Sequence, residues 1–315
     1  MELSIIIPVY NGEKTIEKCI KSVYETTEDF SFEVIVIDDG STDNSRKILE
    51  KLKEDYNTLC VYHQKNQGVS VARNKGLEIA KGKWIVFLDA DDYFEKNWGN
   101  TLKKQFENKS SIVAFVDEPD FSADENSILS MILGLPNYPL IGGIHSKMYR
   151  LKSLQKYQIS FKKDIINGED MLFCLEGYLK TKQISFAKGK YYHYYINNLS
   201  ATHRYSEKQI SSDIKFHKEL HQLLGSEIKY EKYKAFCLLN NFLVFFQRYS
   251  YQKEWSKKEI RKFTETPIFK EGITKYHPYI SLFPKSKRMI LYFIQKKRYN
   301  LVMSLYKVKH KLAKH

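Results

Sequence analysis

The sequence predicts an α/β protein with a mostly parallel central sheet, followed by a helical C-terminal region. Short apolar, β-branched segments alternate with segments of helical periodicity through the first third of the chain. The connections between them are short, and strand–helix–strand units of this kind form parallel sheets with right-handed crossovers. From about residue 206 onward, helical periodicity replaces the alternation.

The predicted strands of the first third are apolar runs that end at polar turns. They cover residues 3–9, 32–37, 59–62 and 84–88. Between them, apolar residues recur at the spacing of a helix that buries one face. These residues are Ile16, Ile20 and Val23, then Ile48, Leu49 and Leu52, then Ala72, Gly76 and Ile79. We therefore expect helices packed on a sheet of parallel strands.

The alternation loosens after residue 110, and residues 119–139 are rich in turn-forming types with one short apolar segment. The remaining predicted elements are a strand over 112–116, helices over 145–154 and 170–180, an aromatic edge strand over 191–196, and helices over 206–265. We expect one domain over residues 1–205, divided into halves at 1–110 and 111–205, and a helical basic region over 206–315.

The composition excludes several classes of protein. With 43% hydrophobic and 14% aromatic residues in 315, the chain can bury a sizeable core, so disorder is not expected. The four cysteines are far apart, without the spacing of a zinc site or a disulfide scaffold. The start lacks the basic region of a signal peptide, and no stretch approaches the length of a membrane-spanning helix. These features favour a cytoplasmic protein.

The positive charge is concentrated at the C-terminal end. Eleven of the 51 Lys and Arg residues follow Glu271, where no Asp or Glu occurs, so residues 1–271 carry a net charge of only +3. From Lys285 onward, an apolar helical stripe is interrupted at Arg298; its members are Ile290, Ile294, Leu301, Leu305, Val308 and Leu312.

A basic amphipathic helix of this kind suits an anionic membrane surface. Peripheral association with the inner face of the plasma membrane through residues 285–315 is therefore one expectation. Packing on the body of the protein or in a homo-oligomer is the other. No nucleic-acid partner is expected, because no nucleic-acid-binding fold accompanies the basic region.

Acidic residues follow two of the predicted strands. Asp38 and Asp39 come after the second strand, and Asp89, Asp91 and Asp92 after the fourth. Ligands of an open parallel sheet bind at the carboxyl ends of its strands. Converging carboxylates repel unless a cation lies among them, and oxygen ligands without His or Cys favour Mg²⁺ or Mn²⁺. For each cluster, ordinary turn chemistry is the alternative.

The common phosphate-binding loops are absent from the sequence. No GxxxxGK[ST] motif occurs, and residues 8–12 after the first strand do not form GxGxxG. A P-loop kinase and a Rossmann dehydrogenase are therefore not expected.

Five motifs in order resemble those of family 2 glycosyltransferases with the GT-A fold. They are SIIIPVYN at 4–11, VIDDGSTD at 36–43, NQG and ARN within 66–76, FLDADD at 87–92 and NGEDMLF at 167–173. FLDADD resembles the DxD metal motif of the family, and NGEDMLF its acceptor-side segment. The tyrosine-rich run after residue 191 is similar to the strand that often follows. The resemblance covers about residues 2–205.

The resemblance implies an inverting transfer of a sugar from a nucleotide diphosphate, most often UDP, to a hydroxyl of a glycan acceptor. A C-terminal region that binds a membrane surface would fit an enzyme whose acceptor is a lipid-linked glycan. It implies that Asp91 binds Mn²⁺ or Mg²⁺ and that the metal bridges both phosphates. The implied donor-binding residues are Pro8, Val9, Tyr10, Asn11, Glu13, Asp38, Asp39, Asn66, Gly68, Arg73, Asp89, Ala90 and Asp92.

Individual roles follow from residue type within that resemblance. Tyr10 would stack on the base or pack beside it, Asp89 would contact ribose, and Arg73 would counter phosphate charge. Glu13 would reach ribose or simply favour the helix dipole. Asp92 would bind sugar hydroxyls or cap the next helix.

An inverting displacement needs a base within hydrogen-bond reach of the acceptor hydroxyl. The resemblance points to Asp170 as that base, with Glu169 orienting hydroxyl groups. A helix N-cap pair is the structural alternative. Lys147 is expected on the surface, with a place near an anionic acceptor as the alternative. His193 and His203 are expected to be structural, with an approach to the diphosphate or the metal as the alternative. A metal-dependent nucleotidyltransferase and a non-catalytic binding module remain the competing functions.

Overall fold

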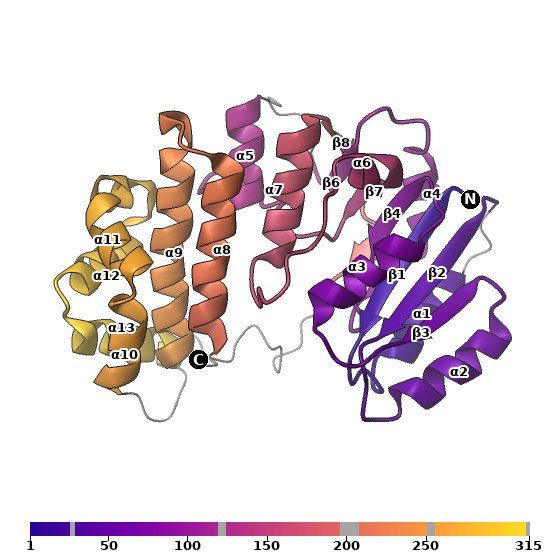
Figure 1. Ribbon diagram of the computed structural model, residues 1–315, viewed down its shortest axis with the longest axis horizontal. Helices are drawn as coiled ribbons and strands as arrows, with labels where there is room; N and C mark the ends of the chain where they lie inside the picture. The colour runs from indigo at the N-terminus through magenta and orange to yellow at the C-terminus, as the bar shows by residue number, and fades with distance from the viewer. Residues whose placement is uncertain (26–28, 119–123, 196–207, 251–255, 313–315) are drawn as a thin grey trace. The chain divides into compact units, whose positions relative to one another are not determined.

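The computed structural model describes residues 1–25, 29–118, 124–195, 208–250 and 256–312 (Figure 1). The chain forms two compact units. The first unit contains Met1–Asp124, Ile141–Asp164 and Glu169–Ile196; the second contains Glu125–Leu140, Ile165–Gly168 and Asn197–His315. The first unit thus ends shortly before the boundary expected at residue 205. Two segments expected within the first domain, 125–140 and 165–168, belong to the second unit.

The first unit is built on a seven-stranded sheet in the order β3-β2-β1-β4-β7-β6-β8. Its strands are β1 (Leu3–Val9), β2 (Phe32–Asp38), β3 (Leu59–His63), β4 (Trp84–Phe87), β6 (Ile112–Val116), β7 (Lys147–Arg150) and β8 (Ile184–Lys188). Parallel pairing joins β3, β2, β1 and β4, and also β6 and β8. Only β7 runs antiparallel to its neighbours in this sheet. The mostly parallel sheet predicted from the sequence is confirmed.

Helices α1 (Ile16–Tyr24), α2 (Ser45–Asp55) and α3 (Val69–Ile79) connect the first four strands. Every residue of β1 is buried, as its β-branched sequence predicts. The approach of α3 to this strand requires a glycine, because a Cβ at Gly76 would lie 2.4 Å from Cγ2 of Ile6. The first unit also contains α4 (Trp98–Lys103), α6 (Leu151–Lys156) and α7 (Glu169–Thr181).

Two expectations about the later elements are corrected. The helix predicted over 145–154 forms only from Leu151, because β7 lies between β4 and β6 and its backbone pairs with both. The predicted edge strand over 191–196 shortens to β9 (Tyr192–His193), which pairs with β5 (Tyr93–Phe94) in a separate two-stranded sheet. Residue 196 lies outside the described residues.

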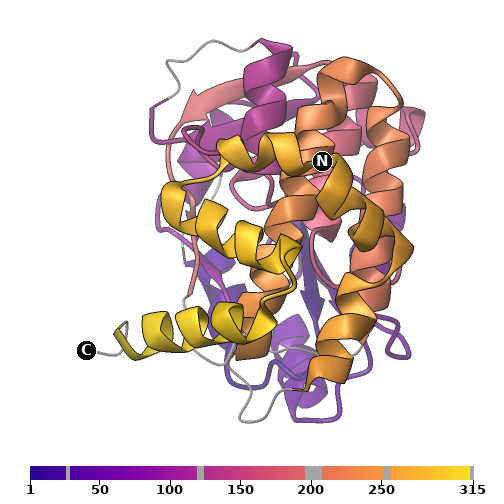
Figure 2. The same ribbon diagram turned by 90° about the vertical axis from the view of Figure 1, so that its left-hand side faces the viewer.

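The second unit is helical. It contains α5 (Glu125–Leu133), α8 (Lys208–Leu224), α9 (Glu231–Ser250), α10 (Lys257–Thr264), α11 (Pro267–Lys275), α12 (Lys285–Gln295) and α13 (Tyr299–Leu312), with two short 3₁₀ helices, Ile228–Tyr230 and His277–Leu282. Helix α9 contacts α5, α8, α11, α12 and α13. Figure 2 brings α10 to α13, coloured orange to yellow, to the front. No helix in the described part of the chain combines the length and apolar character needed to cross a bilayer.

The C-terminal stripe packs on the protein in a different register from the predicted one. The buried residues are Leu291, Ile294, Val302, Met303 and Tyr306, and the Tyr306 hydroxyl donates to the Leu243 carbonyl at 3.0 Å. Leu301 and Val308, which we expected on the apolar face, are 48% and 56% exposed. The register changes because the chain turns between α12 and α13, where Lys297 has a positive φ of 54°.

Candidate active site

Four segments of the first unit place polar side chains at one place. Asp89, Asp91 and Asp92 follow β4, Arg73 lies on α3, and α7 begins with Glu169 and Asp170. His145 comes from the loop before β7. The carboxylates after β4 and at the start of α7, which the sequence separates widely, are therefore in one cluster.

Arg73 holds this cluster together. Its Nη2 donates to Oδ1 of Asp89 at 3.0 Å, and its Nη1 donates to Oδ1 of Asp170 at 2.8 Å and to Oε1 of Glu169 at 3.2 Å. The side chain is 3% exposed. Burial would lower its pKa, but the three carboxylates outweigh burial and raise it. The Nη atoms thus already have carboxylate partners, so the predicted contact of Arg73 with phosphate stays a prediction.

The carboxylates of the cluster differ in protonation. Burial, reinforced by the charge of Asp170, raises the pKa of Glu169 to about 8, although Arg73 opposes the shift. Burial would also raise the pKa of Asp89, but Arg73 and His145 lower it. Burial raises the pKa of Asp91 and of Asp92. At neutral pH, Glu169 therefore holds a proton while Asp89 is ionised.

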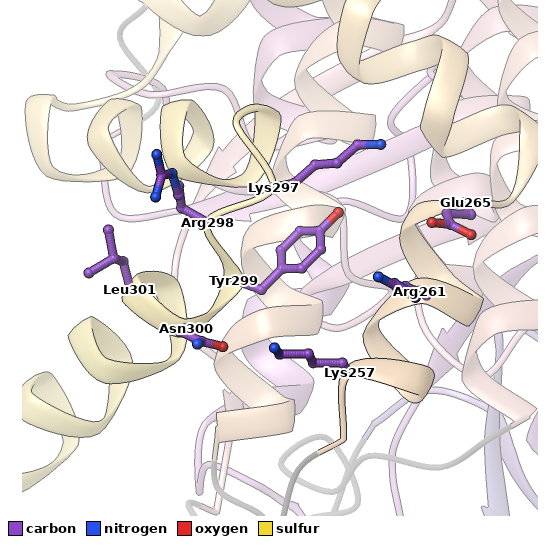
Figure 3. Close-up of a pocket in the computed structure, with 8 residues that line it drawn as sticks. All are labelled: Lys257, Arg261, Glu265, Lys297, Arg298, Tyr299, Asn300 and Leu301. Atoms are coloured by element: carbon purple, nitrogen blue, oxygen red, sulfur yellow. The ribbon is translucent and has the colours of Figure 1, made fainter.

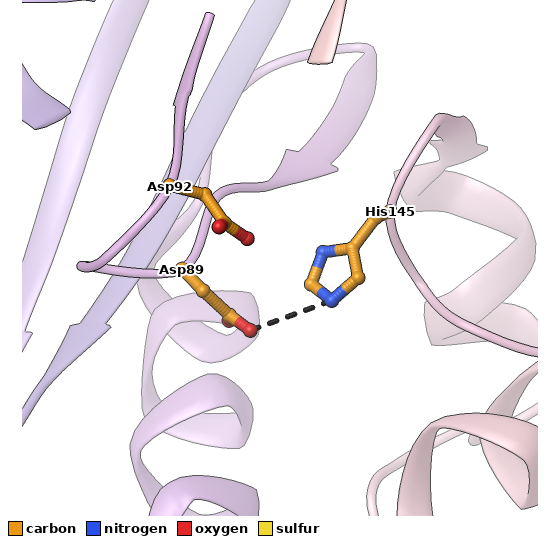
Figure 4. A group of neighbouring side chains, drawn as sticks. All are labelled: Asp89, Asp92 and His145. Carbon is orange, nitrogen blue, oxygen red and sulfur yellow. Dashed lines mark ion pairs between the residues drawn. The ribbon is translucent and has the colours of Figure 1, made fainter. Parts of the chain in front are cut away.

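Asp89, Asp92 and His145 form a group that could hold a metal ion (Figure 4). Their ligand atoms lie within 4.8 Å of one another, and Nε2 of His145 is 3.4 Å from Oδ2 of Asp89. The Nδ1 atom of His145 is buried and has no hydrogen-bond partner among the described residues. Carboxylates suit Mg²⁺ and Mn²⁺, whereas imidazole suits transition metals, so this donor set fits Mn²⁺.

The sequence did not identify His145 as a site residue. An isolated histidine in a segment with helical spacing carried no signal of metal binding. Lys147, expected on the surface, is instead 3% exposed, and its ammonium donates to the backbone carbonyls of Gly143 and His145. Lys147 thus supports the loop that presents His145.

The acidic residues after β4 have distinct surroundings. Asp91, the metal ligand implied by the motif, is exposed and does not belong to the Asp89–Asp92–His145 group. Asp92 is buried and accepts hydrogen bonds from the Tyr192 hydroxyl and from the backbone N–H of Tyr195 at 2.8 Å. The Tyr192 and Tyr195 contacts join Asp92 to the tyrosine-rich segment.

The carboxylates after β2 have other partners. Oxygen atoms of Asp39 accept from the N–H groups of Gln67 and Gly68 at 2.9 and 2.8 Å and from Nε2 of Gln64 at 2.7 Å. Asp38 is 2.8 Å from Nδ1 of His63. These bonds fix the loop that contains Asn66 and Gly68. Asp38 and Asp39 are two of the five carboxylates after β2 and β4 that we expected at one edge of the sheet. Their hydrogen bonds stabilise the neighbouring loop.

The remaining donor-binding candidates lie at the turn after β1. Pro8 and Val9 end the strand, and Tyr10 is 53% exposed. Asn11 accepts from the N–H of Thr42 at 2.8 Å, with a positive φ of 52°. Glu13 accepts from Asn44, both from its backbone N–H at 3.1 Å and from its side chain at 3.0 Å. Ala90 is half-buried beside Asp89. Tyr10 thus presents a free aromatic face, whereas Asn11 and Glu13 tie this turn to the next.

His193, which was considered from the sequence, has partners outside the cluster. His193 lies 3.1 Å from Oε1 of Glu95, and its ring stacks on Tyr93 with centroids 4.3 Å apart. His203 lies outside the described residues.

Comparison with known proteins identifies similar chains. The family model for glycosyl transferase family 2 matches residues 4–166. EpsH of Bacillus subtilis strain 168 is 26% identical over 298 residues, which are 87% of this chain and 86% of EpsH.

Solved structures of two similar proteins share the fold. Residues 1–349 of Staphylococcus aureus TarS match with a TM-score of 0.66 at 22% identity, over 99% of this chain and 92% of that one. This chain spans 55% of the longer TarS structure. TarS 1–349 has also been solved with UDP and with UDP-GlcNAc. A mannosyltransferase from Pyrobaculum calidifontis, in complex with GDP-Man and Mn²⁺, matches with a TM-score of 0.52 at 15% identity, over 89% of this chain and 85% of that one. The expected GT-A architecture is confirmed by these matches.

Proposed function

This chain belongs to glycosyl transferase family 2, and on that premise we propose that it is an inverting enzyme that transfers a sugar from a UDP-sugar to a hydroxyl of a glycan. One observation carries the proposal. The buried guanidinium of Arg73 joins the carboxylate after β4 to the carboxylate pair at the start of α7. Donor-side and acceptor-side motifs of the sequence therefore meet in one cluster.

A UDP-linked donor is supported by the TarS structures, which bind UDP and UDP-GlcNAc. In this chain, the exposed ring of Tyr10 offers a stacking surface for a base. Asp38 and the backbone of residues 8–11 offer hydrogen-bonding groups for its polar edge.

Asp89, Asp92 and His145 would hold a divalent cation. Asp91 lies outside this group, and its proposed role as a ligand rests on the motif. The cation supplies Lewis-acid stabilisation of the charge that develops on the departing diphosphate. The mannosyltransferase complex with Mn²⁺ supports this choice of metal. Lys147 contributes indirectly, because it fixes the loop of His145.

Asp170 serves as the general base. It is 21% exposed and oriented by Arg73. Burial raises the pKa of its neighbour Glu169 to about 8, which favours the protonated form of Glu169 at neutral pH. A protonated Glu169 cannot accept the proton of the attacking hydroxyl, so that role is assigned to Asp170.

The test is turnover against a panel of nucleotide sugars with Mn²⁺, with Mg²⁺ and with chelator. We expect one donor to release UDP, with activity lost in chelator and reduced about 10²- to 10⁴-fold in Asp170→Asn. Asp55→Asn, an exposed carboxylate at the end of α2, is the matched control and should keep full activity.

Two outcomes would overturn the proposal. Release of a sugar 1-phosphate instead of UDP would show attack on phosphorus and would assign the site to a nucleotidyltransferase. No turnover with any donor, together with no metal-dependent UDP binding by calorimetry, would leave the non-catalytic binding module as the better description.

A further inference from the structure

A basic pocket lies within the second unit, and it contains none of the candidate active-site residues. Helix α10 contributes Lys257 and Arg261, and the turn between α12 and α13 contributes Lys297 and Arg298. The pocket encloses about 490 Å³, a volume within the range of small-molecule sites. Four cationic side chains, two from α10 and two from the α12–α13 turn, thus line one concave surface.

Tyr299, which lines the pocket, is held by two contacts. The Tyr299 ring lies at the centre of the group in Figure 3. Its hydroxyl donates to Oγ1 of Thr264 at 3.2 Å, and its ring stacks on Phe246 with centroids 5.7 Å apart. Because Thr264 belongs to α10, this bond fixes the distance between the two sources of positive charge.

The cations of the pocket lack charge partners. In the described parts of the chain, none of the four forms an ion pair, and Glu265 is the one acidic residue that lines the pocket. Two lysines elsewhere in the unit are paired, Lys262 with Glu259 and Lys275 with Glu231. Gathering unpaired like charges is unfavourable unless an anion shares the site, so the pocket is suited to a ligand with negative charge.

Apolar side chains are exposed on the same two C-terminal helices. Leu301, which lines the pocket, is 48% exposed, and Tyr292 and Met289 on α12 are 50% and 46% exposed. A free phosphate ester would not contact these exposed apolar side chains. A bilayer surface offers both anionic headgroups and an apolar boundary that they can contact. The chain carries no Asp or Glu after residue 271, so charge complementarity with an anionic surface extends along this whole region.

We propose that this pocket binds the phosphate of an anionic lipid headgroup and so docks the second unit on a membrane surface. This mode differs from insertion of the apolar stripe expected from the sequence, because the buried residues of α12 and α13 are committed to packing on α9. The proposal does not depend on the proposed sugar transfer.

The test is sedimentation of the full chain with phosphatidylcholine vesicles, with and without phosphatidylglycerol. We expect binding only to vesicles that contain phosphatidylglycerol. Replacing both arginines, Arg261→Gln with Arg298→Gln, should weaken the partitioning by about 25-fold, because each basic residue near the membrane strengthens the attraction to anionic lipid. Lys218→Gln with Lys270→Gln removes the same charge from exposed positions outside the pocket and should leave partitioning within about twofold.

A second measurement, with a soluble ligand, distinguishes a lipid headgroup from a free phosphate ester. Leu301→Ser should weaken vesicle binding while leaving calorimetric binding of glycerol phosphate unchanged. The proposal is overturned if wild-type protein ignores phosphatidylglycerol, or if the two double variants lose binding equally. It is also overturned if glycerol phosphate binds while vesicles do not, because the pocket would then serve a soluble phosphate ester. Thermal unfolding of each variant checks that the fold is intact.

Discussion

Nη1 of Arg73 donates a 2.8 Å hydrogen bond to Oδ1 of Asp170, although the two residues are 97 positions apart. The same guanidinium reaches Asp89 and Glu169. One buried cation therefore compensates three carboxylates, and its loss would leave each of them without that partner. We therefore expect substitutions of Arg73 to destabilise the protein.

Arg73→Met should lower the free energy of unfolding by about 3–5 kcal/mol, because removing one partner leaves buried carboxylates uncompensated. Arg73→Lys should recover part of the loss, since an ammonium keeps the charge but cannot contact all three acids in the geometry of a guanidinium. Urea denaturation measures both. Equal stability of Arg73→Met and wild type would contradict the described ion pairs.

Glu169 should make stability depend on pH. Its pKa rises from 4.5 to about 8 on folding, so its favourable contribution is complete below about pH 4.5 and is lost as the pH rises through about 8. Glu169→Gln should therefore gain stability relative to wild type, on the order of a few kcal/mol, between about pH 5 and pH 9. Urea unfolding at both pH values tests this. A constant difference between the two proteins would show that Glu169 is ionised throughout.

His145→Ala should weaken Mn²⁺ binding at least about tenfold, because the group of Asp89 and Asp92 loses its imidazole. Electron paramagnetic resonance of free Mn²⁺ during a titration gives the affinity. His193→Ala is the matched control, since that ring pairs with Glu95 and stacks on Tyr93 instead. Equal Mn²⁺ affinity in the two variants would remove His145 from the ligand set.

Ser212→Ala should destabilise the segment that leads into the carboxylate pair. Oγ of Ser212 accepts a 2.8 Å hydrogen bond from the N–H of Ile166, and residues 165–168 run directly into Glu169. Ser212 is buried whereas Ile166 is half exposed, so the loss of this hydrogen bond should cost about 0.5–1.5 kcal/mol.

We expect this variant to lose turnover more than UDP affinity, measured by steady-state kinetics and calorimetry. Ser211→Ala next to it is the control, because its exposed hydroxyl bonds only within α8, to the Lys208 carbonyl at 2.8 Å. If both serine variants behave alike, the Ile166 contact has no role in positioning Glu169 and Asp170.

The sequence alone determined the parallel strands, the helices between them and the helical character of the second unit. These features depend on local periodicity and on turns, which neighbouring residues specify. It also identified the acidic residues after β4 and the Glu169–Asp170 pair, because each stands in a short contiguous motif. The family assignment from those motifs is confirmed by the family model that matches residues 4–166.

Only the tertiary structure decided the features that depend on distant partners. Pairing with β4 and β6 converted the start of a predicted helix into β7, and the same fold buried Lys147 and brought His145 to Asp89. The turn at Lys297 set which face of α12 and α13 is buried. In each case, backbone hydrogen bonds and burial between segments far apart in the chain outweighed local preference, and no local pattern encodes them.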